Sequence, residues 1–86
     1  MTLRFTGVDP NNGGNGSPTV WVAPETDDLV IQGRRADVRT EKACAGFEIQ
    51  GHAMGIPDHE AVVRIPARMA LILREACDVA ERGELR

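Results

Sequence analysis

The alternation of side-chain types is clearest in residues 19–23, which predict a β-strand. This run, Thr-Val-Trp-Val-Ala, is rich in β-branched and aromatic residues and stops at Pro24. Successive side chains of a strand point to opposite faces, so Val20 and Val22 share one face and Trp21 lies on the other. Since both faces carry apolar side chains, we expect both to need cover.

Two further apolar runs predict neighbouring strands. Residues 29–32, Leu-Val-Ile-Gln, follow a turn at 24–28 and end at Gly33, which favours a hairpin with the first run. Residues 3–8 are a candidate strand that precedes both. Residues 9–18 hold three Asn, three Gly and two Pro, a composition that predicts a flexible loop.

The end of this hairpin is echoed eighteen residues later in the chain. Leu-Val-Ile-Gln-Gly at 29–33 is matched by Phe-Glu-Ile-Gln-Gly at 47–51, and each copy places a large apolar residue two positions before an Ile. The match predicts a further strand that ends at a Gly suited to a bulge or a positive φ, with coincidence as the alternative. The connecting residues 36–46 are expected to contain little helix.

A C-terminal helix is the element that the sequence predicts best. Residues 61–65, after a turn at 56–60, predict a last strand that meets Pro66, and proline is common at the first position of a helix. An apolar stripe of helical period follows, formed by Met69, Ile72, Leu73, Ala76 and Ala80. Gly83 stands where the helix should end. Leu71 lies off the stripe, either as a harmless exposed side chain or as part of a contact surface.

These elements predict an α+β fold, with a small antiparallel sheet of four to five short strands and one C-terminal helix. A length of 86 residues predicts a single domain, 1–86. One helix can cover only part of one sheet face, so the face that carries Trp21 should stay open unless another chain covers it. Three aromatic residues make a lean core, which favours self-association.

Composition narrows the function classes. A hydrophobic share of 42%, a charged share of 27% and a net charge of -3 indicate a globular chain without a general affinity for polyanions. No apolar run has the length of a signal peptide or a membrane span, so we expect a cytoplasmic protein without a membrane partner. Cys44 and Cys77 are far apart, which indicates neither a disulfide framework nor a zinc knuckle.

The sequence contains no catalytic motif. Cys44, His52, Asp58 and His59 are the only group that resembles a metal or thiol site, but their spacing follows no known ligand pattern, so we interpret them as solvated side chains. No Ser-His-Asp elbow, no HExxH and no phosphate-binding loop occurs. We therefore expect no cofactor, no metal and no enzymatic activity.

One local basic patch follows the second strand of the hairpin. It consists of Arg34, Arg35, Arg39 and Lys42. A solvated loop is the simplest interpretation. A protein partner with acidic side chains fits better than DNA, because the net charge is negative and no nucleic-acid-binding motif is present.

Three segments in order carry a family resemblance. Gly-Gly-Asn-Gly at 13–16, Val-Trp-Val-Ala at 20–23 and Arg-Gly-Glu-Leu at 82–85 follow one another as a Gly-rich loop, a strand and a helix end. In this order the chain resembles, over residues 12–86, the small actinobacterial developmental regulators of the BldB kind and a related short domain encoded beside helix-turn-helix regulators. The related domain commonly has a Cys after the loop and a Trp in the helix; this chain has neither, so the BldB-like branch is the better match.

The resemblance implies a non-enzymatic regulatory protein that forms a homodimer and controls bacterial development by binding a helix-turn-helix transcription factor, without contacting nucleic acid directly. The alternative is a small DNA-binding repressor or antitoxin-like protein. We expect a surface around Trp21 and Leu71 to close the dimer by apolar burial. Arg34 and Arg35 would then meet an acidic surface on the regulator.

Overall fold

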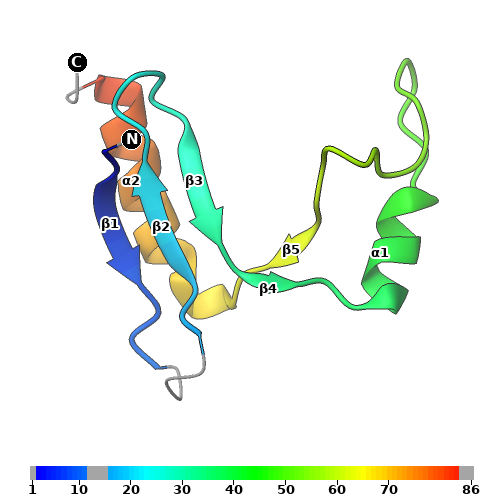
Figure 1. The fold of residues 1–86 in the computed structure, drawn as a ribbon, viewed down its shortest axis with the longest axis horizontal. Coiled ribbons are helices and arrows are strands. Elements are labelled where there is room, and N and C mark those ends of the chain that lie inside the picture. Colours follow the sequence, from blue (N-terminus) through cyan, green and yellow to red (C-terminus); the bar gives the residue numbers. More distant parts are fainter. Residues whose placement is uncertain (1, 12–15, 84–86) are drawn as a thin grey trace. The chain divides into compact units, whose positions relative to one another are not determined.

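The computed structural model describes residues 2–11 and 16–83 and divides the chain into two compact units (Figure 1). Unit 1 comprises Met1–Gly33 and Ile65–Arg86, and unit 2 comprises Arg34–Arg64. The expectation that the whole length forms one domain stays a prediction.

Unit 1 contains a three-stranded antiparallel sheet with the strand order β1-β2-β3. Strand β1 spans Arg4–Val8, β2 spans Thr19–Val22 and β3 spans Leu29–Gln32. The predicted hairpin is confirmed, since β2 pairs with β3 and Trp21 lies opposite Val30. The candidate first strand is also present, as β1.

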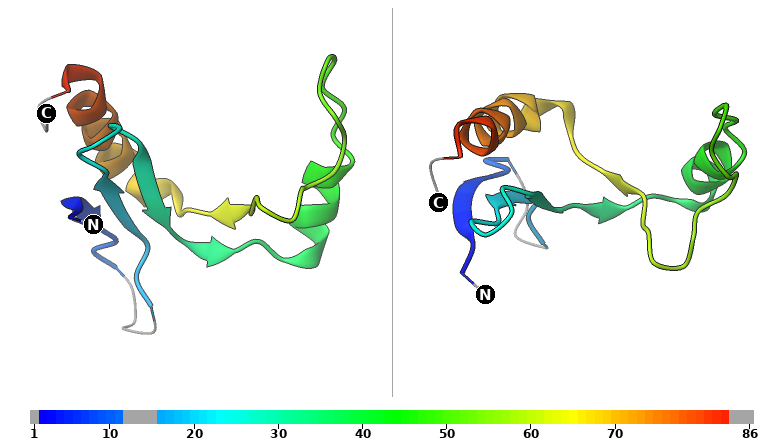
Figure 2. Two further views of the ribbon diagram at one scale, coloured as in Figure 1. Left: turned by 45° about the horizontal axis from the view of Figure 1, so that its top comes forward. Right: turned by 90° about the horizontal axis from the view of Figure 1, so that it is seen from above.

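The predicted C-terminal helix is confirmed. Pro66 precedes a short 3-10 turn, η1 (Ala67–Met69), which leads into helix α2 (Ala70–Arg82). Gly83 ends the helix with a left-handed φ of 63°, and its N–H donates to the carbonyls of Val79 and Ala80. Figure 2 shows α2 lying along one face of the three strands.

The core of unit 1 lies between this helix and the strands. Val20 and Val22 of β2 and Met69 and Ala76 from the helical segment are fully buried, and the predicted apolar stripe packs against them. Helix α2 comes so close to β1 that a Cβ atom on Gly7 would lie 2.6 Å from Cγ2 of Ile72. A residue without a side chain is therefore required at this crossing.

Unit 2 has one pair of two-residue strands and a helix. Strand β4 (Arg34–Arg35) pairs antiparallel with β5 (Val63–Arg64), and α1 spans Val38–Ala45. The expectation of little helix in this region was wrong. Asp37 caps the helix, its Oδ1 accepting a hydrogen bond of 2.8 Å from the Thr40 N–H, and no residue of α1 is buried.

The strand expected at 47–50 was also wrong. Residues 47–49 have no regular structure and a turn follows, in which the His52 N–H donates to the Ile49 carbonyl at 3.0 Å. Gly51 has the positive φ that the motif suggested, 84°, but in that turn. Phe47 and Ile49 are 69% and 54% exposed, so no partner surface holds them in a strand. The echo of the hairpin motif is a coincidence.

The predicted α+β class is confirmed: residues 2–11 and 16–83 contain five short strands, which form one sheet of three strands and one of two. The last predicted strand, 61–65, is reduced to β5. The turn predicted before it is present, since the Glu60 N–H donates to the Pro57 carbonyl at 2.9 Å.

Candidate protein interaction surface

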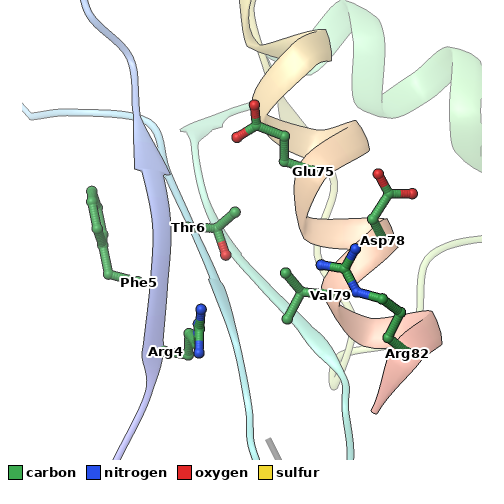
Figure 3. A pocket seen from close by; sticks show the side chains of 7 residues that line it. All are labelled: Arg4, Phe5, Thr6, Glu75, Asp78, Val79 and Arg82. Carbon is green, nitrogen blue, oxygen red and sulfur yellow. The ribbon is translucent and has the colours of Figure 1, made fainter. Parts of the chain in front are cut away.

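The sheet of unit 1 presents an apolar row on the face turned away from α2. Val20 and Val22 pack beneath the helix, so Trp21 between them points to the opposite face. Phe5 and Val30 are the cross-strand partners of Trp21 and share its face. Figure 3 shows the Phe5 side chain leaving β1 away from α2. We call this row, Phe5, Trp21 and Val30, the open face.

The open face has the properties of a contact surface. Phe5 is 58% exposed, and Trp21 and Val30 are half-buried. The row crosses all three strands of the sheet and contains no charged side chain. Trp21 is held at its centre by strands on both sides, so covering it with another surface would cost little side-chain entropy.

Leu71 lies elsewhere. It is 59% exposed on α2, the helix that covers the other face of the sheet. The structure therefore does not bring Trp21 and Leu71 together into one surface, as the sequence had led us to expect. The alternation in β2 contained the signal for this separation, because it already assigned Trp21 to the face opposite Val20 and Val22.

Arg34 and Arg35 are exposed in β4 of unit 2. Arg34 lies directly opposite Arg64 of β5, a pairing of like charges that disfavours the ladder. Arg64 turns toward α1, where its Nη1 donates to Oγ1 of Thr40 at 3.1 Å. Neither Arg34 nor Arg35 forms an ion pair within residues 2–11 and 16–83, so their guanidinium groups are available to a partner.

The same corner of unit 2 holds the cap of α1. The backbone N–H and the side-chain hydroxyl of Thr40 both lower the pKa of Asp37 below its ordinary value of 3.8, and the charge of Arg64 lowers it further. A charged Asp37 suits this position, because anionic groups stabilise helix N-termini.

An ion pair between the buried Asp9 and the half-exposed Arg68, which the sequence did not reveal, anchors the loop between β1 and β2. Nε and Nη2 of Arg68 donate to the two carboxylate oxygens of Asp9, each at 2.7 Å, and the Asn11 N–H donates to Oδ1 at 3.0 Å. The hydrogen bonds from Arg68 hold the pKa of Asp9 below its ordinary value. No local pattern could have predicted the pair, since its members are 59 residues apart.

The two ends of that loop are therefore fixed. Asp9 is 4% exposed, and its N–H donates to the Pro18 carbonyl at 2.8 Å, which closes the loop where it leaves the sheet. The Gly-rich segment on which the resemblance partly rests, residues 13–15, lies outside the described residues, as do Glu84 and Leu85.

A shallow depression of about 410 Å³ lies between β1 and α2 (Figure 3). Its lining residues are Arg4, Phe5, Thr6, Glu75, Asp78, Val79 and Arg82. Oγ1 of Thr6 is buried there without a hydrogen-bond partner in the described structure. The lining contains two arginines and two carboxylates, so it presents no net charge to a ligand.

The residues that the sequence offered as a metal or thiol site form no metal-binding group among the described residues. Cys44 and Cys77 are free and exposed. Within the described ranges, no three His, Cys, Asp or Glu side chains are placed to hold a metal ion, so Cys44, His52, Asp58 and His59 form no ligand set there. No described helix has the length and apolar character needed to cross a membrane.

Comparison with known proteins adds nothing to this geometry. No protein-family model, no curated protein and no solved structure matches the chain. The likeness to the BldB-like regulators therefore stays a prediction from the sequence.

Proposed function

We propose that this chain is a non-enzymatic, cytoplasmic regulatory protein that acts as a homodimer and binds a transcription factor of the helix-turn-helix type. The observation that carries the binding role is the open face, an uncharged apolar row with two aromatic residues on the side of the sheet that α2 leaves uncovered. The resemblance to BldB-like regulators supports the regulatory role.

The open face fits a protein better than a small ligand. A small ligand needs a concave site that surrounds most of its surface, whereas this row is the face of a three-stranded sheet. Aromatic side chains near the centre of a contact provide much of the binding energy in protein complexes. Covering the exposed part of Phe5 would contribute on the order of 1–2 kcal/mol, and covering the smaller remaining part of Trp21 would contribute less.

The basic residues of unit 2 add a second requirement for the partner. Arg34 and Arg35 are exposed and lack ion pairs in the described part of the chain, so an acidic surface on a partner, either the transcription factor or a second copy of the chain, would match them. Such rim charges mainly raise the association rate and select the partner.

The test compares two substitutions of equal character on opposite sides of unit 1. Phe5→Asp and Leu71→Asp each place a carboxylate at an exposed apolar position, 58% and 59% exposed respectively. Binding to the helix-turn-helix regulator recovered with the wild-type chain in an affinity pull-down is measured by calorimetry, and circular dichroism checks that both variants fold. We expect Phe5→Asp to abolish binding and Leu71→Asp to leave it unchanged.

Two results would contradict the proposal. Equal binding by both variants would remove the open face as the contact surface. A salt-dependent shift of promoter DNA by the pure protein, without the regulator, would favour the alternative of a small DNA-binding repressor.

A further inference from the structure

The outer edge of strand β3 has backbone groups with no strand to pair with. Among the described residues β3 pairs only with β2 and is the last strand of its sheet. The Ala23 N–H donates to the Asp28 carbonyl at 2.9 Å, so the backbone of Asp28 faces β2. Since successive residues of a strand face opposite directions, Val30 also faces β2, whereas the N–H and C=O groups of Leu29 and Ile31 face outward.

This edge is short but lacks the charge, the proline and the register irregularity that protect many edge strands. The other edge strand, β1, carries the charged Arg4 and a register irregularity between Phe5 and Gly7. Strand β3 reads Leu-Val-Ile-Gln, with no charge, no proline and no irregularity in its pairing. Leu29 and Ile31 are also each 38% exposed, so the helix leaves their side chains incompletely covered.

We propose that the outer edge of β3 binds β3 of a second copy of this chain, in antiparallel orientation across a two-fold axis. The inference rests on the homodimer part of the proposed function and states which contact forms it. With Val30 on the axis, Leu29 of each copy lies opposite Ile31 of the other. All four outward-facing residues then exchange backbone hydrogen bonds, and their exposed side chains pack together.

The order of charges along the chain identifies the occupant as a second copy. An acidic turn that contains Glu25 and Asp28 precedes β3, and only Gly33 separates the strand from Arg34 and Arg35. Antiparallel pairing of a strand with itself places the beginning of each copy beside the end of the other. The acidic turn of one copy therefore meets the arginines of its partner at both ends of the contact.

This pairing also enlarges the open face. Val30 lies on the same face as Trp21, so the rows of the two copies meet at the axis and form one apolar band across six strands. A single transcription factor, or two related by the same axis, would then dock on a surface to which both copies contribute.

The first test removes one outward-facing donor. Ile31→Pro deletes an N–H that points away from β2, so the pairing within unit 1 is retained, and Ile31→Ala serves as the matched control that keeps this N–H. The wild-type chain should have about twice its mass of 9.3 kDa in light scattering. Because one hydrogen bond is lost from each copy, Ile31→Pro should raise the dimer Kd by about thirtyfold relative to Ile31→Ala.

The second test reverses the charges at the two ends of the proposed contact and leaves strand β3 itself unchanged. One chain carries Arg34→Glu and Arg35→Glu, and the other carries Glu25→Lys and Asp28→Lys. Each chain alone should be largely monomeric because like charges meet at both ends. An equimolar mixture should form a heterodimer, detected by native mass spectrometry.

The outcomes separate this proposal from the proposed function. A wild-type chain that is monomeric at every concentration overturns both the β3 contact and the homodimer. A wild-type dimer that Ile31→Pro does not weaken and that shows no charge-dependent pairing overturns the β3 contact alone, since the homodimer then forms through another surface.

Discussion

Unit 1 and unit 2 belong to one chain but are stabilised in different ways. Unit 1 has a core in which Val20, Val22, Met69 and Ala76 are fully buried. Among the described residues of unit 2 only Ala36 is buried, with 4% of its surface exposed. Most of its large apolar side chains are exposed to solvent: Val38, Phe47, Ile49, Met54 and Val63 are all more than 40% exposed.

The difference shows that hydrogen bonds at turns and helix ends can define a segment without a core. Unit 2 depends on the Asp37 cap, on tight turns at Gly51 and Pro57–Glu60, and on a two-residue ladder. Each contributes about 1 kcal/mol at most, so the unit is expected to open locally far more often than unit 1. Unit 1 gains several kcal/mol from burial alone.

One substitution made in both units gives the largest contrast. Met69 is fully buried and Met54 is 57% exposed, so Met69→Ala and Met54→Ala remove the same atoms from opposite environments. We expect Met69→Ala to lower the free energy of unfolding by about 3 kcal/mol and Met54→Ala by less than about 0.5 kcal/mol. Amide hydrogen exchange followed in each unit at increasing urea concentrations measures both, because it reports on unit 2 as well as on unit 1. Equal losses would mean that unit 2 has a core after all.

Acid should weaken unit 1 through a single ion pair. The pKa of Asp9 is lowered in the folded chain, so its carboxylate stabilises the fold above its ordinary value of 3.8, and this contribution is lost as the pH falls through the lower folded value. Asp9→Asn should therefore destabilise the protein at neutral pH, and its deficit relative to wild type should shrink in acid. Asp58→Asn, in unit 2, controls for the loss of one negative charge. A deficit that is constant with pH would show that the ion pair contributes nothing.

The smallest effect is expected from the cap of α1. Asp37→Ala removes the acceptor for the Thr40 N–H and should speed amide hydrogen exchange in residues 38–41. Exchange in α2 should not change, because no residue of α1 belongs to the core cluster of unit 1. Thr26→Ala is the matched control, because it removes a side-chain oxygen that accepts a hydrogen bond from a backbone N–H, that of Asp28, at a turn of unit 1. Faster exchange throughout α2 would contradict the expectation that the cap stabilises unit 2 alone.

Burial patterns made the fold of unit 1 predictable. The alternation in residues 19–22 and the helical stripe from Met69 each describe one face that must be covered, and both elements formed where the sequence placed them. The elements of unit 2 were not predicted because they bury no apolar face, so their sequences carry no clear apolar periodicity. The sequence signal for α1 is Asp37, a residue that can cap a helix, followed by residues that favour helix. The weak apolar pattern of this segment concealed that signal.

The sequence predicted the exposed position of Trp21 but not which residues surround it in the candidate surface. The position of Trp21 on an exposed sheet face followed from alternation, but its neighbour Phe5 depends on the register between β1 and β2, which is irregular between Phe5 and Gly7. The sequence pattern placed neither Trp21 nor Leu71 in the core, so both were expected in one contact surface. In the structure Trp21 lies on one face of the sheet, and Leu71 lies on the helix that covers the other face. The Asp9–Arg68 pair required tertiary structure.

The ladder between β4 and β5 also bears on how this protein can change over evolutionary time. Arg34 and Arg64, the first and last residues of unit 2, are paired with each other, so the chain leaves and re-enters unit 1 at adjacent points. A segment with such closely spaced ends can be lengthened, shortened or exchanged for another without stretching the sheet and helix that it interrupts. The 31 residues between Gly33 and Ile65 thus form a segment whose length and sequence can change while the sheet and helix of unit 1 are kept.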